Sequence, residues 1–414
     1  MSDATELSLA DFLFTDSDDP LVPSDGYLEW RSAGSWATSL YEPHLFGPPG
    51  PRVEIQRAGM RREVINLASY NYMGFAAHPE VIEAAREALS KYGTGACGSP
   101  LLSGLSDLHL ELEEQLSRFM GRESTMLFNS GFGGAMGALA GMLRKGDAAV
   151  VDEKSHLSLI AGANVSRAKL HFFKHNDPAS LDAVLTQTEG KRRIVVVEGI
   201  YSMDGDMADL PALLEVSEKH RVGMFIDEAH SILAWGRTGR GITEHHGVGE
   251  RVGLVFATFS KAFAGVGGYV SGKKATLDYL RYYSNPYGFS CALPPSVVAG
   301  LLKALEISQR DPSIRQTLMD NTAYFHEHLK AMGLNVGDST TQVVPIIIGS
   351  DRKLLYDLCH EMNGKGLFLP PVDYPSVPED GLRYRAAVTA AHTREDLDEA
   401  LQIIKDTIVK RTRQ

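Results

Sequence analysis

The stretch Ala257–Gly268 reads A-T-F-S-K-A-F-A-G-V-G-G and places one lysine, Lys261, between a short apolar run and a glycine-rich loop. A lysine at the end of a buried strand is costly to keep as a bare cation, so it tends to lose its proton or to form a bond. The most informative such bond is a Schiff base with an aldehyde cofactor. A lysine beside glycines is also common in ordinary surface loops, so the rest of the chain has to decide.

The composition is that of a soluble globular protein large enough for two packed domains. The chain has 414 residues, 43% apolar and 22% charged, with a net charge of −11. Net acidity argues against nucleic-acid binding. The cysteines Cys97, Cys291 and Cys359 follow no CxxC pattern and predict neither a disulfide framework nor a metal site. No apolar run is long enough to span a membrane, and the acidic N-terminus differs from a signal peptide, so a cytoplasmic protein is expected.

Seven short apolar runs are separated by segments of helical length. The runs are Thr125–Phe128, Ala148–Val151, Leu170–Phe173, Ile194–Val197, Gly223–Ile226, Leu254–Ala257 and Gly268–Val270. The intervening predicted helices include Gly131–Leu143, Pro178–Leu185 and Leu210–His220. This alternation predicts an α/β fold with a seven-stranded, mainly parallel sheet covered by helices on both faces.

The predicted domain organisation has three parts. Residues 1–60 form an N-terminal arm, irregular up to about Pro51, in which Gly26–Leu40 could hold a short helix. Residues 61–295 form the large domain. Residues 296–414 form a small C-terminal α/β domain, completed by part of the N-terminal segment and ending in a predicted helix Arg394–Lys410.

Polar residues follow five of the seven predicted strands. Ligands of such sheets bind beyond the carboxyl ends of the strands, so these residues are expected to share one site. They are Ser130-Gly131-Phe132-Gly133, Asp152 with His156, Glu198 with Tyr201-Ser202, Asp227-Glu228-Ala229-His230, and Thr258 with Lys261.

Asp227 and Lys261 together suggest a specific cofactor. A carboxylate at a strand end is commonly a solvated or capping group. Paired with a lysine, it has a sharper use, because it can hold the pyridine nitrogen of pyridoxal phosphate protonated. The ring then accepts electrons from the α-carbon of an amino acid, and Lys261 would carry the cofactor as a Schiff base.

Further residues offer groups for the rest of such a cofactor. The helix expected to begin at Ser130-Gly131-Phe132-Gly133 has free backbone N–H groups for a phosphate, and Thr258 and Ser260 offer hydroxyls on the other side. His156 could lie over the ring, and His230 could reach its 3-oxygen. An ordinary hydrogen-bonded histidine is an equally good interpretation of each ring.

Several motifs together resemble those of the α-oxoamine synthases, a family that includes serine palmitoyltransferase, 8-amino-7-oxononanoate synthase, 5-aminolevulinate synthase and 2-amino-3-ketobutyrate CoA ligase. The resemblance runs from about Val64 to the C-terminus. It rests on Ser69-Tyr-Asn-Tyr-Met-Gly, Glu198-Gly-Ile-Tyr-Ser-Met-Asp-Gly-Asp206, Asp227-Glu-Ala-His-Ser231, Gly239-Arg-Gly241, Thr258-Phe-Ser-Lys-Ala262, Leu293-Pro-Pro295 and Ala390-Ala-His-Thr393.

The resemblance implies a fold type I pyridoxal-phosphate enzyme that works as a homodimer with shared active sites. It implies Lys261 as the Schiff-base lysine, Asp227 as the pyridinium partner and His156 as the stacking histidine. The remaining implied site residues are His230 and Ser202 at the ring oxygen, Gly131, Phe132, Thr258 and Ser260 at the phosphate, Ser290 across the dimer, and Asn71 and Arg385 at the substrate.

Arg383 and Arg385 are both candidates for binding a substrate carboxylate. Strand alternation places them on one face, and a guanidinium fork suits a carboxylate. Relative to Ala390-Ala-His, Arg385 matches the substrate-binding arginine of the family, and Arg383 is expected to be structural.

The implied reaction is a decarboxylative condensation of an amino acid with an acyl thioester, carried by CoA or an acyl-carrier protein, most like serine palmitoyltransferase. Within the family, the glycine-using 2-amino-3-ketobutyrate CoA ligase and the 8-amino-7-oxononanoate synthase also fit. Outside the family, an aminotransferase or lyase of the same fold fits, and so does a non-catalytic subunit. Departures from the family pattern concern substrate recognition: Leu369 before Pro370-Pro371, Leu233, Cys291 and Pro100.

Overall fold

The computed structural model describes residues 7–13, 17–32, 40–57 and 60–412. Its chain divides into two compact units. The first comprises Met1–Ser69, Met203–Gly205 and Met319–Gln414, and the second comprises Tyr70–Ser202 and Asp206–Leu318. The domain limits expected from the sequence, after residues 60 and 295, stay predictions. No helix among the described residues is long and apolar enough to cross a membrane.

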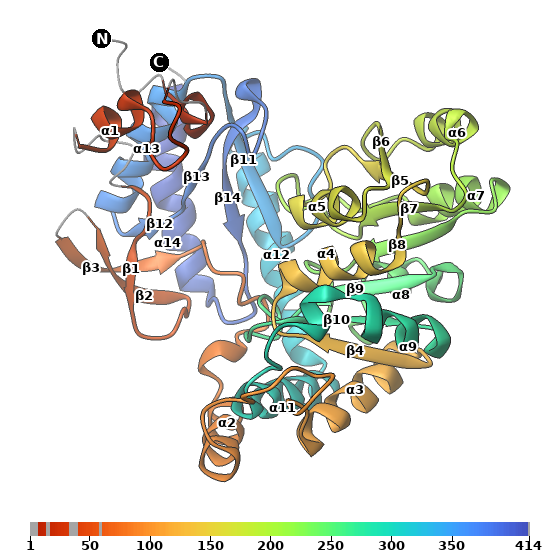
Figure 1. The fold of residues 1–414 in the computed structure, drawn as a ribbon. Helices are drawn as coiled ribbons and strands as arrows, with labels where there is room; N and C mark the ends of the chain where they lie inside the picture. Colours follow the sequence, from red (N-terminus) through yellow and green to blue (C-terminus); the bar gives the residue numbers. More distant parts are fainter. Residues whose placement is uncertain (1–6, 14–16, 33–39, 58–59, 413–414) are drawn as a thin grey trace. The chain divides into compact units, whose positions relative to one another are not determined.

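The second unit is built around a seven-stranded sheet with the order β4-β10-β9-β8-β7-β5-β6 (Figure 1). Its strands are β4 (Ser124–Phe128), β5 (Ala148–Asp152), β6 (Lys169–Phe173), β7 (Arg193–Glu198), β8 (Gly223–Asp227), β9 (Leu254–Thr258) and β10 (Gly268–Gly272). Only β10 runs antiparallel to its neighbours. All seven predicted runs are therefore strands of one sheet, which confirms the α/β fold.

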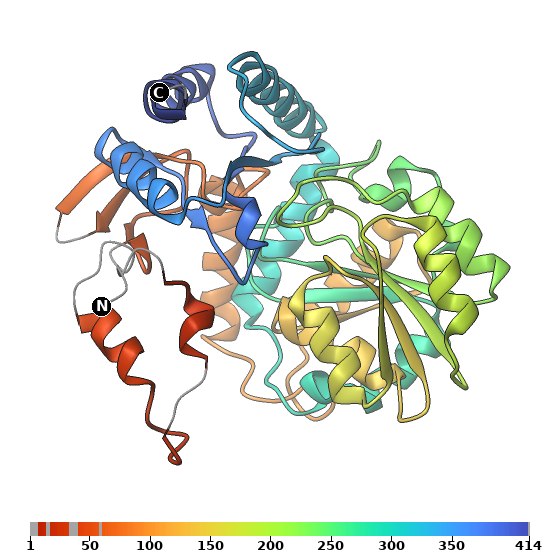
Figure 2. The same cartoon turned by 90° about the horizontal axis from the view of Figure 1, so that it is seen from above.

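Helices cover both faces of this sheet (Figures 1 and 2). They are α2 (Pro79–Tyr92), α3 (Asp107–Met120), α4 (Gly131–Met142), α5 (Leu157–Ser166), α6 (Pro178–Gln187), α7 (Leu210–Lys219), α8 (Ile242–His245), α9 (Lys274–Tyr283), α10 (Asn285–Gly288) and α11 (Pro295–Arg310). Side chains of α4, α5 and α9 share one buried core with the strands; Ala138, Leu159 and Leu277 are all fully buried there. This packing fixes the strand ends on which the polar residues lie.

The first unit has two smaller sheets. One joins β1 (His44–Phe46), β2 (Arg52–Arg57) and β3 (Met60–Asn66) with β12 (Leu367–Phe368); the other has the order β11 (Val343–Gly349), β14 (Leu382–Ala387) and β13 (Pro371–Val372). The described helices with residues here are α1 (Asp25–Ser32), α12 (Ser313–Ala331), α13 (Arg352–Gly364) and α14 (Arg394–Ile404).

Two expectations about this part of the chain need correction in detail. The segment before Pro51 is not irregular throughout, because β1 forms within it; the short helix suggested within Gly26–Leu40 is present as α1 up to Ser32, and residues 33–39 lie outside the described residues. The predicted final helix Arg394–Lys410 is helical over its whole length, but Lys405–Val409 form a π-helical turn between α14 and α15 (Lys410–Thr412).

Candidate active site

A cavity of about 320 Å³ opens at the carboxyl ends of β7, β8 and β9, next to the first residues of α4 and α5. The cofactor residues expected from the sequence line it, with the exception of Ser290. They are Gly131, Phe132, His156, Ser202, Asp227, His230, Thr258, Ser260 and Lys261. The sheet therefore brings together, in one unit, side chains that lie up to 130 residues apart in sequence.

One wall of this cavity is a polar cradle at the N-terminus of α4. Ser130 caps the helix, and its Oγ accepts a hydrogen bond of 3.1 Å from the Gly133 N–H. A Cβ at Gly131 would lie 2.4 Å from Thr258 Oγ1, so only glycine fits here. The Ser260 hydroxyl lies 2.8 Å from that of Thr258. Helix N–H groups facing two hydroxyls suit a phosphate group, and the cradle fits the phosphate of pyridoxal phosphate.

A second part of the cavity lining is acidic and deeply buried. Asp227 ends β8 with 3% of its surface exposed and accepts a hydrogen bond of 2.8 Å from the Ala229 N–H. Burial raises the pKa of Asp227 to about 6, against the opposing influence of the Lys261 charge. A carboxylate with few partners in such a place is stabilised by a nearby cation, and a protonated pyridine nitrogen would be one.

Glu198 is a second buried carboxylate at a strand end; it was expected to share the site, but no role was assigned to it. It lies directly beside Asp227 in the register of β7 and β8, and 2% of its surface is exposed. It accepts a hydrogen bond from the His156 backbone N–H. Burial raises the pKa of Glu198 well above its ordinary range, and the negative charge of Asp227 raises it further. A cation in the cavity would stabilise the ionised form of either carboxylate.

The two histidines of the site have different surroundings. His156 caps α5, where its Nδ1 lies 2.8 Å from the Ser158 hydroxyl, and its ring meets the Phe132 ring edge-on. His230 is buried, with its Nδ1 2.8 Å from the Tyr72 hydroxyl. Both rings line the cavity, but their roles toward a cofactor stay predictions.

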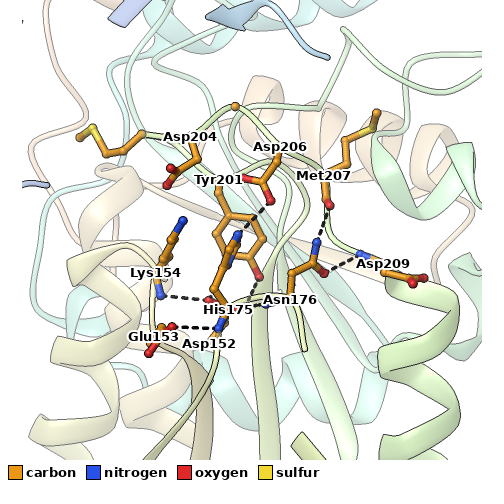
Figure 3. Close-up of polar contacts among 12 residues, drawn as sticks. Asp152, Glu153, Lys154, His175, Asn176, Tyr201, Asp204, Asp206, Met207 and Asp209 are labelled. Carbon is orange, nitrogen blue, oxygen red and sulfur yellow. Dashed lines mark hydrogen bonds and ion pairs between the residues drawn. The ribbon is translucent and has the colours of Figure 1, made fainter. Parts of the chain in front are cut away.

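A network behind the cavity involves a histidine that the sequence analysis missed (Figure 3). His175 follows β6, and its ring lies 3.0 Å from Asp152 Oδ1 and 2.9 Å from Asp206 Oδ2. The Tyr201 hydroxyl donates to the other oxygen of Asp152 at 2.9 Å. Burial opposes protonation, but the two carboxylates raise the pKa of His175 to about 9. A charged His175 thus holds the ends of the segment 201–206, which carries Ser202.

Three predicted site residues lie outside the cavity lining. Asn71 is buried and its Oδ1 accepts a hydrogen bond of 3.1 Å from the Ala76 N–H. Ser290 belongs to the same unit but does not reach the cavity within one chain. Arg385 belongs to the first unit, where one of its Nη atoms lies 3.6 Å from Met203 Sδ. Their roles stay predictions.

Arg383 is bound entirely within the first unit. It is 5% exposed and donates to the carbonyls of Gly381 and Met203, at 2.7 and 3.1 Å, and to Asp204 at 2.9 Å. These contacts support the structural role that was expected for it.

The chain is similar to known proteins over most of its length. The aminotransferase class I and II family matches residues 62–404. The 8-amino-7-oxononanoate synthases of Thermoanaerobacter pseudethanolicus and Symbiobacterium thermophilum are 39% and 40% identical over 86% and 87% of this chain, which cover 90% and 92% of those proteins.

Solved serine palmitoyltransferases are similar in fold. The enzyme from S. paucimobilis, with bound PLP and myriocin, has a TM-score of 0.87 at 30% identity, covering 94% of this chain and 97% of that one. The Sphingomonas wittichii enzyme has a TM-score of 0.88 at 31% identity over the same shares. The chain belongs to the aminotransferase class I and II family, and within it to the pyridoxal-phosphate-dependent α-oxoamine synthases.

Proposed function

We propose that this chain condenses an amino acid with an acyl thioester, releasing carbon dioxide and a free thiol and forming an α-aminoketone. The observation that carries the proposal is a cavity that combines the glycine-floored cradle, buried Asp227 and Lys261. Family membership supports the same reaction class.

Bound pyridoxal phosphate supplies an electron sink for the bond broken at the α-carbon of the amino acid. The chain's own residues would act around it. Asp227 holds a proton on the ring nitrogen, because a buried carboxylate stabilises a neighbouring cation. Lys261 would hold the cofactor through its amine, and its free amine would move the proton at the α-carbon. The Gly131–Thr258 cradle fixes the phosphate, and Glu198 holds the His156 backbone.

Within this class we place the 8-amino-7-oxononanoate synthase type first. Relatives of that name are 36–40% identical to this chain, whereas the solved serine palmitoyltransferases are 30–31% identical. The name of that product defines its parts. The amino carbon and its methyl group derive from alanine after decarboxylation, and the remaining seven carbons derive from an acyl thioester that ends in a carboxylate.

Serine with a long-chain acyl thioester is the second candidate, because the fold similarity to serine palmitoyltransferase covers 94% of the chain. In the test, alanine and serine are each combined with the seven-carbon thioester and with the long-chain thioester. The release of thiol and of carbon dioxide is measured in the same reaction. Equal amounts of both products, highest with alanine and the seven-carbon thioester, are expected. Consumption of amino acid without thiol release would indicate an aminotransferase or lyase and overturn the proposal.

We further propose that the working form is a homodimer in the cytoplasm. The large apolar side chain next to the predicted cross-dimer residue Ser290 is exposed in the single chain, Phe289 by 87%. An exposed aromatic group at this place favours a protein partner. Phe289→Glu is expected to shift the mass measured by light scattering from dimer to monomer; an unchanged dimer would exclude this contact.

A further inference from the structure

A second cavity in the cofactor-binding unit, of about 430 Å³, has no lining residue in common with the first. It lies between the end of α3, the loop 237–240 and the end of α11. Four of its lining residues are arginines: Arg118, Arg237, Arg240 and Arg315. The remaining polar lining comes from Gln115, Thr238, Ser308 and Gln309.

The carboxylates near these arginines neutralise them only in part. Arg118 pairs with Glu114 at 2.6 Å, but both side chains are about two-thirds exposed, so the attraction is weak. Arg240 Nε lies 3.9 Å from Glu244. The oxygens of Glu244 accept hydrogen bonds from the Thr238 N–H, the Thr238 hydroxyl and the Arg240 N–H, at 2.9, 2.7 and 3.1 Å. Glu244 therefore serves mainly to fix the loop.

Arg315 forms no ion pair within the described parts of the chain. Its Nη2 donates to the Arg237 carbonyl at 2.9 Å. Burial lowers the pKa of its guanidinium, with only the Glu244 charge opposing this shift. A cation held half-buried beside three others is stabilised by an anion.

Three buried donor atoms in the lining point to the same kind of ligand. Ser308 is 1% exposed, and its hydroxyl has no hydrogen-bond partner among the described residues. The individual atoms Arg240 Nε and Arg315 Nη1 are also buried and have no hydrogen-bond partner among the described residues. Native proteins rarely leave buried donors of this kind unused, so their grouping in one cavity is informative.

The loop that carries two of the arginines is held in a defined conformation. Gly239 has a φ of +95°, and a Cβ there would lie 3.1 Å from Arg315 Nη1, so the guanidinium rests directly on the loop backbone. The loop ends at Ile242, whose N–H donates to the buried Glu228 at 2.9 Å. The arginines are thus positioned before any ligand arrives, which favours binding.

We propose that this arginine pocket, lined by Arg118, Arg237, Arg240 and Arg315, is a second ligand site that binds a di- or polyphosphate anion. Guanidinium groups bind phosphate oxygens through paired hydrogen bonds, and several close cations favour a multiply charged ligand over a single carboxylate. The site is independent of the proposed reaction, because its residues do not line the cofactor cavity.

Calorimetric titration of the cofactor-loaded enzyme tests the proposal, since the cofactor then fills its own phosphate cradle. Inorganic pyrophosphate tests the free anion, and ADP tests the same group carried by a nucleoside. Saturable binding of either at low salt is expected, with at least tenfold loss of affinity in Arg315→Gln and Arg240→Gln. Raised salt should weaken binding, as it does for exposed charges.

Arg251→Gln is the matched control, because Arg251 is a surface arginine that pairs with Glu218 at 2.8 Å, away from this pocket. It should bind pyrophosphate as the wild type does. Ser308→Ala should weaken binding severalfold, and it replaces Arg315→Gln if that variant does not fold. Thiol release should stay within twofold in these variants, which separates this proposal from the catalytic one. No saturable binding, or equal binding by wild type and the Arg240→Gln and Ser308→Ala variants, would overturn it.

Discussion

Asp152 and Asp227 occupy equivalent positions, at the carboxyl ends of the parallel strands β5 and β8, and both are almost fully buried. Their electrostatic states are opposite. Burial acts to raise the pKa of Asp152, but its bond to His175 prevails and lowers that pKa below its ordinary value. Asp227 has one backbone donor and a carboxylate neighbour, and its pKa is raised to about 6.

The difference shows how one fold position serves two purposes. Asp152 receives hydrogen bonds from two backbone N–H groups, at Lys154 and Asn176, and from the Tyr201 hydroxyl, in addition to His175. These hydrogen bonds from the protein itself compensate the negative charge of Asp152, so Asp152 stabilises the loops that donate them. Asp227 keeps its capacity to stabilise a cation, and that capacity is what a pyridinium ring requires.

The largest effect is expected from removing the lysine that faces Asp227. Lys261→Ala should lower the rate of thiol release by about a thousandfold or more, because the principal base contributes on that order. Lys154→Ala, next to Asp152, keeps the backbone N–H and should have little effect. Turnover by Lys261→Ala within about tenfold of wild type, about 1.4 kcal/mol of barrier, would contradict the assignment.

Replacing each aspartate by asparagine tests the comparison directly. Asp227→Asn should slow exchange of the substrate α-proton, followed by NMR in deuterated water, by roughly a hundredfold or more, since an amide does not hold the ring nitrogen protonated. Asp152→Asn should leave that exchange much less changed and instead destabilise the fold.

The pH dependence of apoprotein stability should separate the same two residues. Because folding raises the pKa of Asp227 from 3.8 to about 6, its ionisation lowers the free energy of unfolding as pH rises between these values. At pH 7, Asp227→Asn should therefore be more stable than wild type by roughly 1–3 kcal/mol. Asp152→Asn should be less stable at pH 7. A destabilised Asp227→Asn apoprotein would show that Asp227 is structural.

His175 sharpens the comparison from the side of Asp152. Because its pKa is raised from 6.5 to about 9, its stabilising effect is complete below pH 6.5 and is lost as pH rises through 9. His175→Gln should lose about 1.5–3 kcal/mol at pH 6 and show a flatter denaturant-unfolding profile between pH 6.5 and 9. His220→Gln, beside the partly exposed Asp182, is the control with a smaller loss. Parallel pH profiles for wild type and His175→Gln would contradict the charged state.

The smallest effect concerns Arg383 and Arg385, the two arginines of β14. Arg385→Lys should weaken amino-acid binding about tenfold, because the charge remains but the paired hydrogen bonds are lost. Arg383→Lys should mainly reduce stability. Titrating amino acid while following the cofactor absorbance measures the affinity in both variants. If only Arg383→Lys weakened binding strongly, Arg383 and not Arg385 would bind the substrate carboxylate.

Much of the sheet could be predicted because its strands are buried on both faces and read as continuous apolar runs. The helices α5 and α9 were missed for different reasons. Small residues and glycine give Leu157–Ser166 no clear apolar stripe, and Lys274–Tyr283 follows a strand with only a one-residue break. The hairpin of β2 and β3 was missed because the three consecutive charged residues Arg61–Glu63 interrupt the apolar pattern of β3.

The candidate site was predictable where a residue's position at a strand end was informative by itself, as for Lys261 and Asp227. The partnership of Glu198 with Asp227, and that of His175 with Asp152 and Asp206, depends on which strands are neighbours. The order β8-β7-β5-β6 departs from chain order, and no local pattern reveals it. The arginine pocket was missed for the same reason, since its residues come from segments 115–119, 237–240 and 308–315.

The segment 201–206 has a consequence for unfolding. Asp206 is held by His175 in the second unit, while its neighbour Gly205 belongs to the first, where its carbonyl accepts a hydrogen bond of 2.8 Å from the Thr341 hydroxyl. Consecutive residues are thus anchored in separate compact units, and Ser202 of the cofactor cavity lies three residues before Gly205. Loss of structure in the first unit would remove the anchor at Gly205, so amide exchange at Ser202 should become faster with it.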